Sequence, residues 1–437
     1  MSDYLFMLES HLDGPQNRAV AEMQRMATEA GMNIWLTGGA MRDMLRGSRI
    51  RDLDFTVERD ACKFGKAVAK ALDAEILEED SLKRWIEMLL PGGTRVSVSN
   101  ARAEKYSKPG SKPQVSTATI HDDLLRRDFT INAIALSLNR GSRGLLIDPA
   151  NGQADLANRE LRATNSYVFF DDPSRIFRLV RFEHMLGMQV STRVQSQLEN
   201  ALMEGYHKVA PAEALAAEIR ALATSENIVA ALEAFERLDL LKLIGPSLTA
   251  AKLNTAGIAR FEKLLHGVLP PETAEASIAF LALLVEKLSP RERTEVIKAF
   301  RLSKQEADAL KRIDADAKKL EAALKSAKVT RPSHVYEVLA PASADEILLV
   351  LYRSQHRVVQ DRIRTFYQKY QPMAQEVTEE QVLATGAKPG TPKFAKTWST
   401  MIAAHLNARP RKVLPEEIPA PPPPPQQTSA FARGIRR

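Results

Sequence analysis

The sequence predicts an α/β head followed by a long all-α body. Short β-like runs separated by turns fill about the first 150 residues, and beyond about residue 165 the apolar residues recur at helical spacing. Hydrophobic residues make up 44% of the 437 positions, an ordinary share for a chain that buries a core. A wholly disordered protein is therefore excluded.

Changes in this pattern divide the chain into four predicted domains. We expect the head at residues 1–150, a helical neck at 151–235, a helical body and tail at 236–410, and a disordered, basic, Pro-rich tail at 411–437. The run from Pro419 to Pro425 cannot form a helix or a core, so this last segment reads as a polyproline-type spacer.

Charge and cysteine content limit the class of protein. The 61 basic and 54 acidic residues give a net charge of +7, which mildly favours polyanionic partners. The single cysteine, Cys62, excludes an internal disulfide and a Cys-rich zinc site. It suits a reducing compartment, and the chain starts without the pattern of a signal peptide, so we expect a cytoplasmic protein. The most apolar stretch, residues 277–288, is too short and too charged to span a membrane.

The elements of the head follow from alternation and turn residues. Two strands are predicted at Asn33–Leu36 and Asp52–Val57, with a helix at Ala40–Leu45 between them. A hairpin is predicted from Ile86–Leu90 and Thr94–Ser99, and a loop from Tyr106–Ala118. The helices expected downstream lie at Ile176–Leu186, Ala212–Ala223, Ile228–Leu243, Ala274–Lys287, Arg291–Phe300, Gln305–Leu324, Ala344–Tyr352 and Arg357–Tyr367.

A Gly-Gly turn is the first candidate binding feature. Gly38 and Gly39 stand between a predicted strand and a predicted helix, where outward N–H groups and the helix N-terminus favour phosphate. Arg42 follows one turn into that helix and could add a cation. Taken alone, such a turn is usually only a turn. The sequence has no GxxxxGK[ST] motif, which excludes a Walker-type NTPase.

The second feature is a pair of carboxylates. Asp52 and Asp54 are two residues apart on a predicted strand, so their side chains share a face and repel each other. Paired oxygen ligands suit Mg²⁺, which also binds substrate phosphates. An isolated DxD pair is more often a solvated strand edge, so the context decides between the two readings.

Four motifs in order supply that context. They are GGxVRDxLLGxxxxDxDF (Gly38, Gly39, Arg42, Asp43, Leu45, Gly47, Asp52, Asp54, Phe55), RRDFTINAIA (Arg126 to Ala135), DPxxGxxDLxxxxLR (Asp148, Pro149, Gly152, Asp155, Leu156, Leu161, Arg162) and EDPxRxLRAxRF (Asp172, Pro173, Arg175, Arg178, Arg181, Phe182). From about residue 30 to 190 the sequence therefore resembles class II tRNA nucleotidyltransferases (CCA-adding enzymes) and bacterial poly(A) polymerases. These families belong to the DNA polymerase β-like nucleotidyltransferase superfamily.

The resemblance implies a fold and an activity. The head would be a polymerase β-like palm, with a small mixed or antiparallel sheet and helices, and the helical parts would be a neck, body and tail that bind RNA. The activity would be template-independent addition of CMP and AMP, from CTP and ATP, to the 3′ end of tRNA or another RNA by a two-metal mechanism.

The resemblance also assigns roles to single residues. Asp52 and Asp54 would be catalytic and would hold Mg²⁺. The nucleotide would be bound by Gly38, Gly39, Arg42, Arg127, Asp128, Asp171, Asp172, Arg175 and Arg178. Within this set, the glycines and Arg42 would hold the triphosphate.

Hydrogen-bond chemistry suggests how a base is chosen. Cytosine and adenine each present an amino donor beside a ring-nitrogen acceptor, which matches a carboxylate beside a guanidinium. Uracil and guanine present the reverse, and the unpaired polar groups would make the mismatch costly. Asp172 and Arg175, at i and i+3 of a predicted helix start, could form this pair. The alternative is a helix-opening salt bridge.

Departures from the family motifs keep other functions open. Ser97 stands where the family usually has a third carboxylate, which Glu87 or Glu104 could replace, and Asp171 stands for Glu. A later helical motif is degraded at residues 211–219. The alternatives are a poly(A) polymerase, an enzyme adding only CC or only A, and a non-catalytic RNA-binding protein on a decayed head. The sequence leaves the oligomeric state open.

Overall fold

The protein divides into two compact units. The computed structural model describes residues 4–270 and 276–408. The first unit comprises Met1–Lys318 and Ser343–Arg353, and the second comprises Lys319–Ala342 and Ser354–Arg437. The head, neck and body boundaries expected at residues 150 and 235 both fall inside the first unit and stay a prediction. The expected Pro-rich tail at 411–437 lies outside the described residues.

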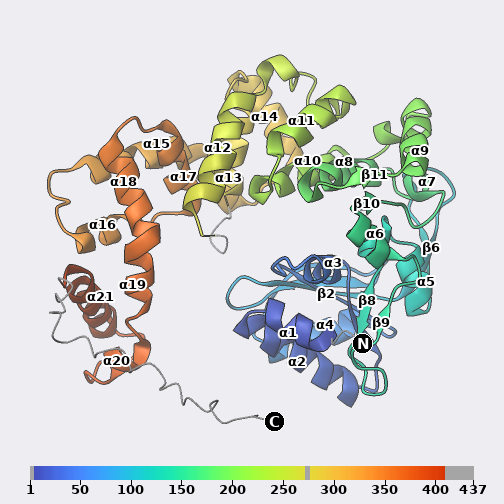
Figure 1. Cartoon of the computed structure of the whole chain (residues 1–437), viewed down its shortest axis with the longest axis horizontal. Coiled ribbons are helices and arrows are strands. Elements are labelled where there is room, and N and C mark those ends of the chain that lie inside the picture. Colours follow the sequence, from blue (N-terminus) through green and yellow to red (C-terminus); the bar gives the residue numbers. More distant parts are fainter. Residues whose placement is uncertain (1–3, 271–275, 409–437) are drawn as a thin grey trace, which may run out of the picture. The chain divides into compact units, whose positions relative to one another are not determined.

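A seven-stranded mixed sheet forms the centre of the head (Figure 1). Its strand order is β3-β4-β5-β2-β1-β8-β9, in which β2 and β5 are parallel and all other neighbours are antiparallel. The strands are β1 (Ile34–Thr37), β2 (Leu53–Val57), β3 (Glu75–Asp80), β4 (Trp85–Leu89), β5 (Arg95–Asn100), β8 (Ala135–Ser137) and β9 (Leu146–Ile147). Two small sheets pair β6 (Arg102–Lys105) with β7 (Gln114–Thr117), and β10 (Glu160–Leu161) with β11 (Gln189–Val190).

The two faces of the sheet differ in chemistry. Alternate residues such as Leu36, Phe55 and Val98 point to one face and join the main apolar core of the head. Helices α2 (Gly14–Glu29) and α4 (Ala61–Ala71) contribute to this core, and α4 packs on β4 and β5. The opposite face carries polar residues along the central strands and a smaller apolar cluster that includes Trp35, Ile120 and Leu124. The polar part of this face is the part available for chemistry.

Helices make up most of the rest of the first unit. Downstream of the sheet, the long helix α15 (Lys304–Lys325) crosses the division between the units. The other helices of the first unit are α1 (Tyr4–His11), α3 (Gly39–Leu45), α5 (Ile120–Leu125), α6 (Gly152–Asn158), α7 (Val168–Asp171), α8 (Arg175–Leu186), α9 (Thr192–Met203), α10 (Ala212–Ala221), α11 (Ile228–Arg237), α12 (Thr255–Val268), α13 (Ser277–Leu284), α14 (Pro290–Ala299) and α17 (Ala344–Arg353).

The second unit is helical and has a core of its own. Its buried cluster includes Val382, Ile402 and Leu406, with aromatic residues such as Trp398 packed against it. The helices are α16 (Pro332–Leu339), α18 (Arg357–Thr365), α19 (Gln371–Gln375), α20 (Glu379–Leu383) and α21 (Pro392–Asn407). No helix in the described part of the chain is both long and apolar enough to cross a membrane.

The structure confirms the α/β head followed by helices and corrects local details. The expected loop at Tyr106–Ala118 contains strand β7, and the predicted helix Ile228–Leu243 breaks at Asp239, whose backbone is left-handed at φ 57°. Only a cross-strand partner gives β7 its structure, since its own residues show no clear apolar alternation. The sheet also gains β3, an acidic and mostly exposed strand without apolar alternation.

Gly152 gives a test of the packing beneath the polar face. A Cβ atom at Gly152 would lie 2.2 Å from the carbonyl oxygen of Thr130, a backbone atom that cannot turn away. We expect Gly152→Ala to lower the free energy of unfolding by about 1–3 kcal/mol. Gly141→Ala, at a glycine with open space around its Cβ position, is the control and should change it little. Equal thermal midpoints for the two variants would contradict this packing.

Candidate functional site

A row of polar side chains crosses the second face of the sheet. The strand register places Thr37 opposite Asp54, Asp54 opposite Ser97, and Ser97 opposite Glu87. Residues directly opposite each other on neighbouring strands project to the same face. Four strands therefore bring two carboxylates and two hydroxyl groups into one line.

Asp52 lies beside this row, and its acidity is perturbed. It stands just before β2, two residues from Asp54, and its side chain remains exposed. Partial desolvation and the charge of Asp54 raise the pKa of Asp52 to about 6, assisted by Glu87 and opposed by Arg95. Two carboxylates that repel in this way favour a cation between them.

This donor set fits a divalent metal bound together with substrate. The described residues include no group of three His, Cys, Asp or Glu side chains able to hold a metal ion. Asp52 and Asp54 would thus supply two protein ligands, and phosphate oxygens and water would fill the remaining positions. This pattern is typical of Mg²⁺ in phosphoryl-transfer sites.

Ser97 takes part in the row as a hydrogen-bond donor. Its Oγ donates to Oδ1 of Asp54 at 2.7 Å, so it orients that carboxylate. Of the two alternative acids, Glu104 is engaged elsewhere, because it accepts hydrogen bonds from Arg102 and Tyr106. Glu87 is the acid next to Ser97 in the row, where it pairs with Arg95 at 3.4 Å.

Gly38 allows the backbone to pass close to the carboxylates. Its φ is 68°, which L side chains rarely adopt, and a Cβ would lie 3.1 Å from Oδ2 of Asp54 and 3.3 Å from Nη1 of Arg127. At Gly39, a Cβ would meet Arg42 and Asp54 at 3.6 and 3.7 Å. The Gly-Gly turn thus borders the row directly, as expected from the sequence.

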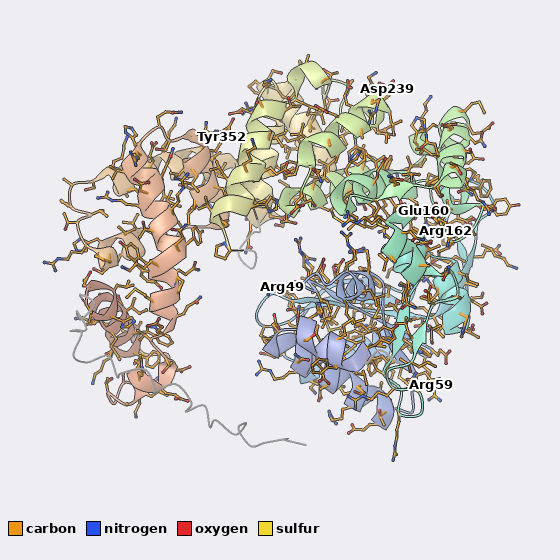
Figure 2. All side chains as sticks on the ribbon, viewed as in Figure 1. Arg49, Arg59, Glu160, Arg162, Asp239 and Tyr352 are labelled. Carbon is orange, nitrogen blue, oxygen red and sulfur yellow. The ribbon has the colours of Figure 1, made fainter. Side chains whose placement is uncertain are left out.

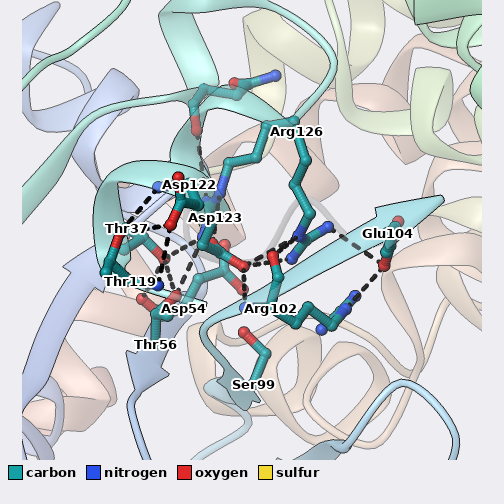
Figure 3. Close-up of polar contacts among 12 residues, drawn as sticks. Thr37, Asp54, Thr56, Ser99, Arg102, Glu104, Thr119, Asp122, Asp123 and Arg126 are labelled. Carbon is teal, nitrogen blue, oxygen red and sulfur yellow. Dashed lines mark hydrogen bonds and ion pairs between the residues drawn. The ribbon is translucent and has the colours of Figure 1, made fainter. Parts of the chain in front are cut away.

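Arg127 lies over the same face and is held by several partners. Its Nη2 donates to Thr37 Oγ1 at 3.1 Å, to Thr56 Oγ1 at 3.0 Å and to Asp123 Oδ2 at 2.9 Å. Figure 3 shows Thr37, Asp54 and Thr56 gathered beside Asp123. These bonds fix the guanidinium next to Asp54.

Asp123 is a fully buried carboxylate shared by two arginines. Its Oδ1 accepts from Nη2 of Arg126 at 2.6 Å, and its Oδ2 accepts from Arg127. Burial opposes ionisation of Asp123, but the charges of Arg127 and Arg126 hold its pKa below the ordinary value. Arg126 also forms an ion pair with Glu104 (Figure 3).

Arg42 belongs to a group of arginines around one aromatic ring. The guanidinium groups of Arg42, Arg178 and Arg181 lie 5.4, 5.4 and 4.5 Å from the ring centre of the buried Phe182. Arg42 pairs with Asp43 at 2.8 Å and donates to Oδ1 of Asn132 at 3.0 Å. The ring lets like charges gather through cation–π attraction.

Asp128 is buried and paired with Arg178. Its Oδ2 accepts from Nε of Arg178 at 2.6 Å, and its Oδ1 accepts from Asn132 Nδ2 and the Phe129 amide. Burial would raise its pKa, but the charges of Arg178 and Arg175 and these hydrogen bonds hold the pKa at about 2. Asp128 and Arg178 thus join the head to helix α8.

Asp172 and Arg175 lie close in sequence but have separate partners. Oδ1 of Asp172 accepts from the amide and hydroxyl of Ser174 at 3.0 and 2.6 Å. Nη2 of the buried Arg175 donates to the carbonyl of Arg126 at 2.9 Å. The helix-opening salt bridge weighed from the sequence is not formed by these described residues. Desolvation raises the pKa of Asp171, which ends helix α7.

Sequence reasoning missed the residues that hold the arginines in place. Asp123 precedes Arg126 and Arg127 by three and four residues on α5, the helical spacing that predicts ion pairs. The signal is therefore present in the sequence itself. Thr37, Thr56 and Asn132 come from separate segments, and only the fold shows that all three accept hydrogen bonds from Arg127.

Comparisons with known proteins agree with this geometry. Residues 34–162 match the family model described as the poly A polymerase head domain. The A-adding tRNA nucleotidyltransferase of Halalkalibacterium halodurans is 33% identical over 61% of this chain and 62% of its own length. For that of Geobacter sulfurreducens, the identity is 30% over 57% of this chain and 28% of its own length. The chain thus spans less than two thirds of these curated relatives.

Solved structures support the fold over a longer span. A Thermotoga maritima CCA-adding enzyme complexed with tRNA has a TM-score of 0.52 at 22% identity, over 94% of this chain and 96% of its own. A CCA-adding enzyme in its apo form II gives 0.53 at 23% identity, over 95% and 97% of the two chains. At these identities the likeness establishes the fold.

Asp128 gives a pH test of the site. Its folded pKa of about 2 lies below the ordinary 3.8, so its stabilising contribution is present above pH 4 and is lost as the pH falls toward 2. That difference corresponds to about 2–3 kcal/mol of unfolding free energy. Asp128→Asn should therefore flatten the pH dependence of urea unfolding in this range, whereas the exposed Asp73→Asn should not. Parallel curves for wild type and Asp128→Asn would show that the ion pair does not perturb this carboxyl.

Proposed function

We propose that the chain is a template-independent nucleotidyltransferase, since residues 34–162 match the family model described as the poly A polymerase head domain. It adds CMP and AMP, from CTP and ATP, to the 3′ end of tRNA. The observation that carries this proposal is the row of Asp54, Ser97 and Thr37 beside Asp52, with Arg127 held over it. A cytoplasmic location is part of the proposal.

Asp52 and Asp54 are the metal-binding and catalytic residues in this proposal. They would hold Mg²⁺, which when bound in a two-metal arrangement activates the 3′-hydroxyl and offsets charge on the leaving pyrophosphate. Ser97 keeps Asp54 oriented through its 2.7 Å hydrogen bond. Ionisation of Asp52, whose pKa is about 6, is favoured by the positive charge of a bound cation.

The guanidinium groups around the row receive the triphosphate. Arg127 and Arg42 lie beside Gly38 and Gly39, where the chain can approach the phosphates without side-chain obstruction. Their positions are fixed in advance by Asp123 and by Asn132, so little ordering is needed when a nucleotide binds. In this assignment Asp128 and Arg178 act as a pair that supports the ribose and phosphate end of the nucleotide.

The base is selected by Asp172 and Arg175, with Asp171 at their side. In the structure Arg175 uses N–H groups for the carbonyls of Arg126 and Val168, which fixes its orientation and leaves other N–H groups for a base. Asp172 is held by Ser174 in the same way. A carboxylate and a guanidinium that are each oriented by their own hydrogen bonds can discriminate cytosine and adenine from uracil and guanine.

Addition of A alone is the second candidate. Three curated relatives with 30–33% identity are named A-adding enzymes, while one from Deinococcus radiodurans is named CC-adding. Incubation with tRNA transcripts that end before CCA or before the terminal A, with Mg²⁺ and each nucleoside triphosphate, separates these activities. CCA addition predicts growth by three nucleotides, A addition predicts growth only of the longer transcript, and long adenosine tails would indicate a poly(A) polymerase. No growth of any transcript would leave the RNA-binding alternative.

Asp54 tests the catalytic assignment. We expect Asp54→Asn and Asp52→Asn to lower the rate of incorporation by about a hundredfold or more while thermal stability changes little. Glu75→Gln removes one charge from an exposed site on β3 and should keep the wild-type rate. Near-normal incorporation by either Asp variant would remove the metal-binding role.

Arg175 tests the selection of the base. Arg175→Ala should lower incorporation of CMP and AMP and should narrow the kcat/KM ratio of CTP over UTP by about tenfold or more, because the mismatched base no longer meets an unpaired guanidinium. Arg175→Lys keeps the charge but loses the planar fork, and it should fall in between. A CTP/UTP ratio equal to that of the wild type in Arg175→Ala would disprove the role of this pair.

A further inference from the structure

A hollow in the surface lies beside the C-terminal end of α3. It has a volume of about 360 Å³, and its lining includes Arg46, Gln153, Arg159, Leu186 and Met188. These residues come from α3, from α6 and its end, and from the end of α8 and the chain after it. None of them has been used in the site described above.

Positive charge gathers at this hollow without a matching acid. Among the described residues, neither Arg46 nor Arg159 forms an ion pair with a carboxylate. Desolvation and the nearby charges of Arg42 and Arg159 lower the pKa of Arg46, and Asp43, the one acid that opposes them, is paired with Arg42 at 2.8 Å. Nη2 of Arg46 donates to the carbonyl of Leu186 at 3.2 Å, a neutral partner that leaves the charge of Arg46 available to an anion.

The backbone at Arg159 has a conformation that is unusual for an arginine. Arg159 ends α6 with φ 55° and ψ 42°, the left-handed conformation that Gly or Asn normally supplies at this position. Its carbonyl accepts from the Gln189 amide at 2.8 Å, so the strained geometry is fixed by β11. Such strain in a residue other than glycine is concentrated at functional positions.

We propose that Arg46 and Arg159 bind a phosphodiester group of the RNA. Arg46 follows Arg42 by one helical turn, a rise of about 6 Å, so the hollow lies one turn of α3 away from an arginine of the candidate site. The inference rests on the proposed function, since it names a subsite for that RNA.

The same chemistry could hold a free phosphate or a nucleotide, but the setting favours RNA. The triphosphate already has Arg127, Arg42 and the Gly-Gly turn. The wall of the hollow also includes apolar side chains of Leu45, Leu186 and Met188, against which the ribose of a strand can pack. An RNA strand that continues past the site would provide both a phosphate for the arginines and a ribose to pack against these apolar side chains.

Two single substitutions test the proposal without endangering the fold. Arg46→Gln keeps a good helix former on α3. Arg159→Asn installs a residue that tolerates the left-handed backbone, so its thermal stability should equal or exceed that of the wild type. The control is Arg59→Gln, which removes the same charge from an exposed position of the head (Figure 2).

The measurements are RNA affinity and the separate KM values. With a tRNA transcript lacking CCA, we expect each variant to bind about tenfold more weakly than Arg59→Gln. The slope of log K against log[salt] should be shallower by about 0.7–0.9 for the lost phosphate contact. The KM for RNA should rise, while the KM for CTP and ATP should stay unchanged.

The outcomes separate this proposal from the proposed function. If Arg46→Gln and Arg159→Asn bind RNA like Arg59→Gln, or if the KM for nucleotide rises instead, the subsite is wrong even though the enzyme is active. A third outcome is that inorganic phosphate at millimolar concentration competes in the wild type, that both variants abolish this competition, and that their RNA affinity is unchanged. This outcome would assign the hollow to free phosphate and would also overturn the proposal. If RNA affinity depends on both arginines but no nucleotide is added, the subsite stands and the proposed function fails.

Discussion

The buried carboxylate of Asp123 is the interaction on which the rest of the site depends. Arg126 and Arg127 are adjacent in sequence, and two guanidinium groups cannot be taken out of water together unless an anion lies between them. Asp123 supplies one oxygen to each arginine, and Glu104 supplies a second charge on the side of Arg126. Together with Arg102, these groups balance three positive charges against two negative ones. The residual positive charge faces the region where a polyphosphate would bind.

Aromatic and acidic partners connect this cluster to the helices that follow the sheet. The ring of Phe182 is contacted by Arg42 from α3 and by Arg178 and Arg181 from its own helix. Arg178 in turn donates a hydrogen bond to Asp128, which links helix α8 to the head. The candidate site is therefore not a property of the sheet alone, because α8 supplies Arg175, Arg178 and Arg181. Any movement of α8 relative to the sheet would need several desolvated contacts to break at once.

The sequence predicted the elements of the site better than the contacts within them. Strands β1, β2, β4 and β5 lie within one or two residues of their expected bounds, because alternation and turn residues are local signals. Local patterns also placed Gly38 and Asp54. They did not show that Ser97 would donate to Asp54, or that Asp128 would take Arg178 as its partner, because these pairs are separated by 43 and 50 positions in the chain. The separate partners of Asp172 and Arg175 likewise depend on Ser174 and on the distant carbonyl of Arg126.

The order of strands in the sheet has a consequence for synthesis of the chain. Strand β1 pairs with β8, so Trp35 meets Ser137 across about a hundred residues of sequence, and β2 must wait for β5 to form its parallel pair. Contacts of such large sequence separation form late and slowly, since loop closure precedes any stabilisation. As the chain leaves the ribosome, the aspartates are made early but have no ordered surroundings until the segment from Asp123 to Ser137 has emerged. A nascent chain shorter than this carries the acidic motif without the guanidinium group of Arg127 that lies beside Asp54 in the folded protein.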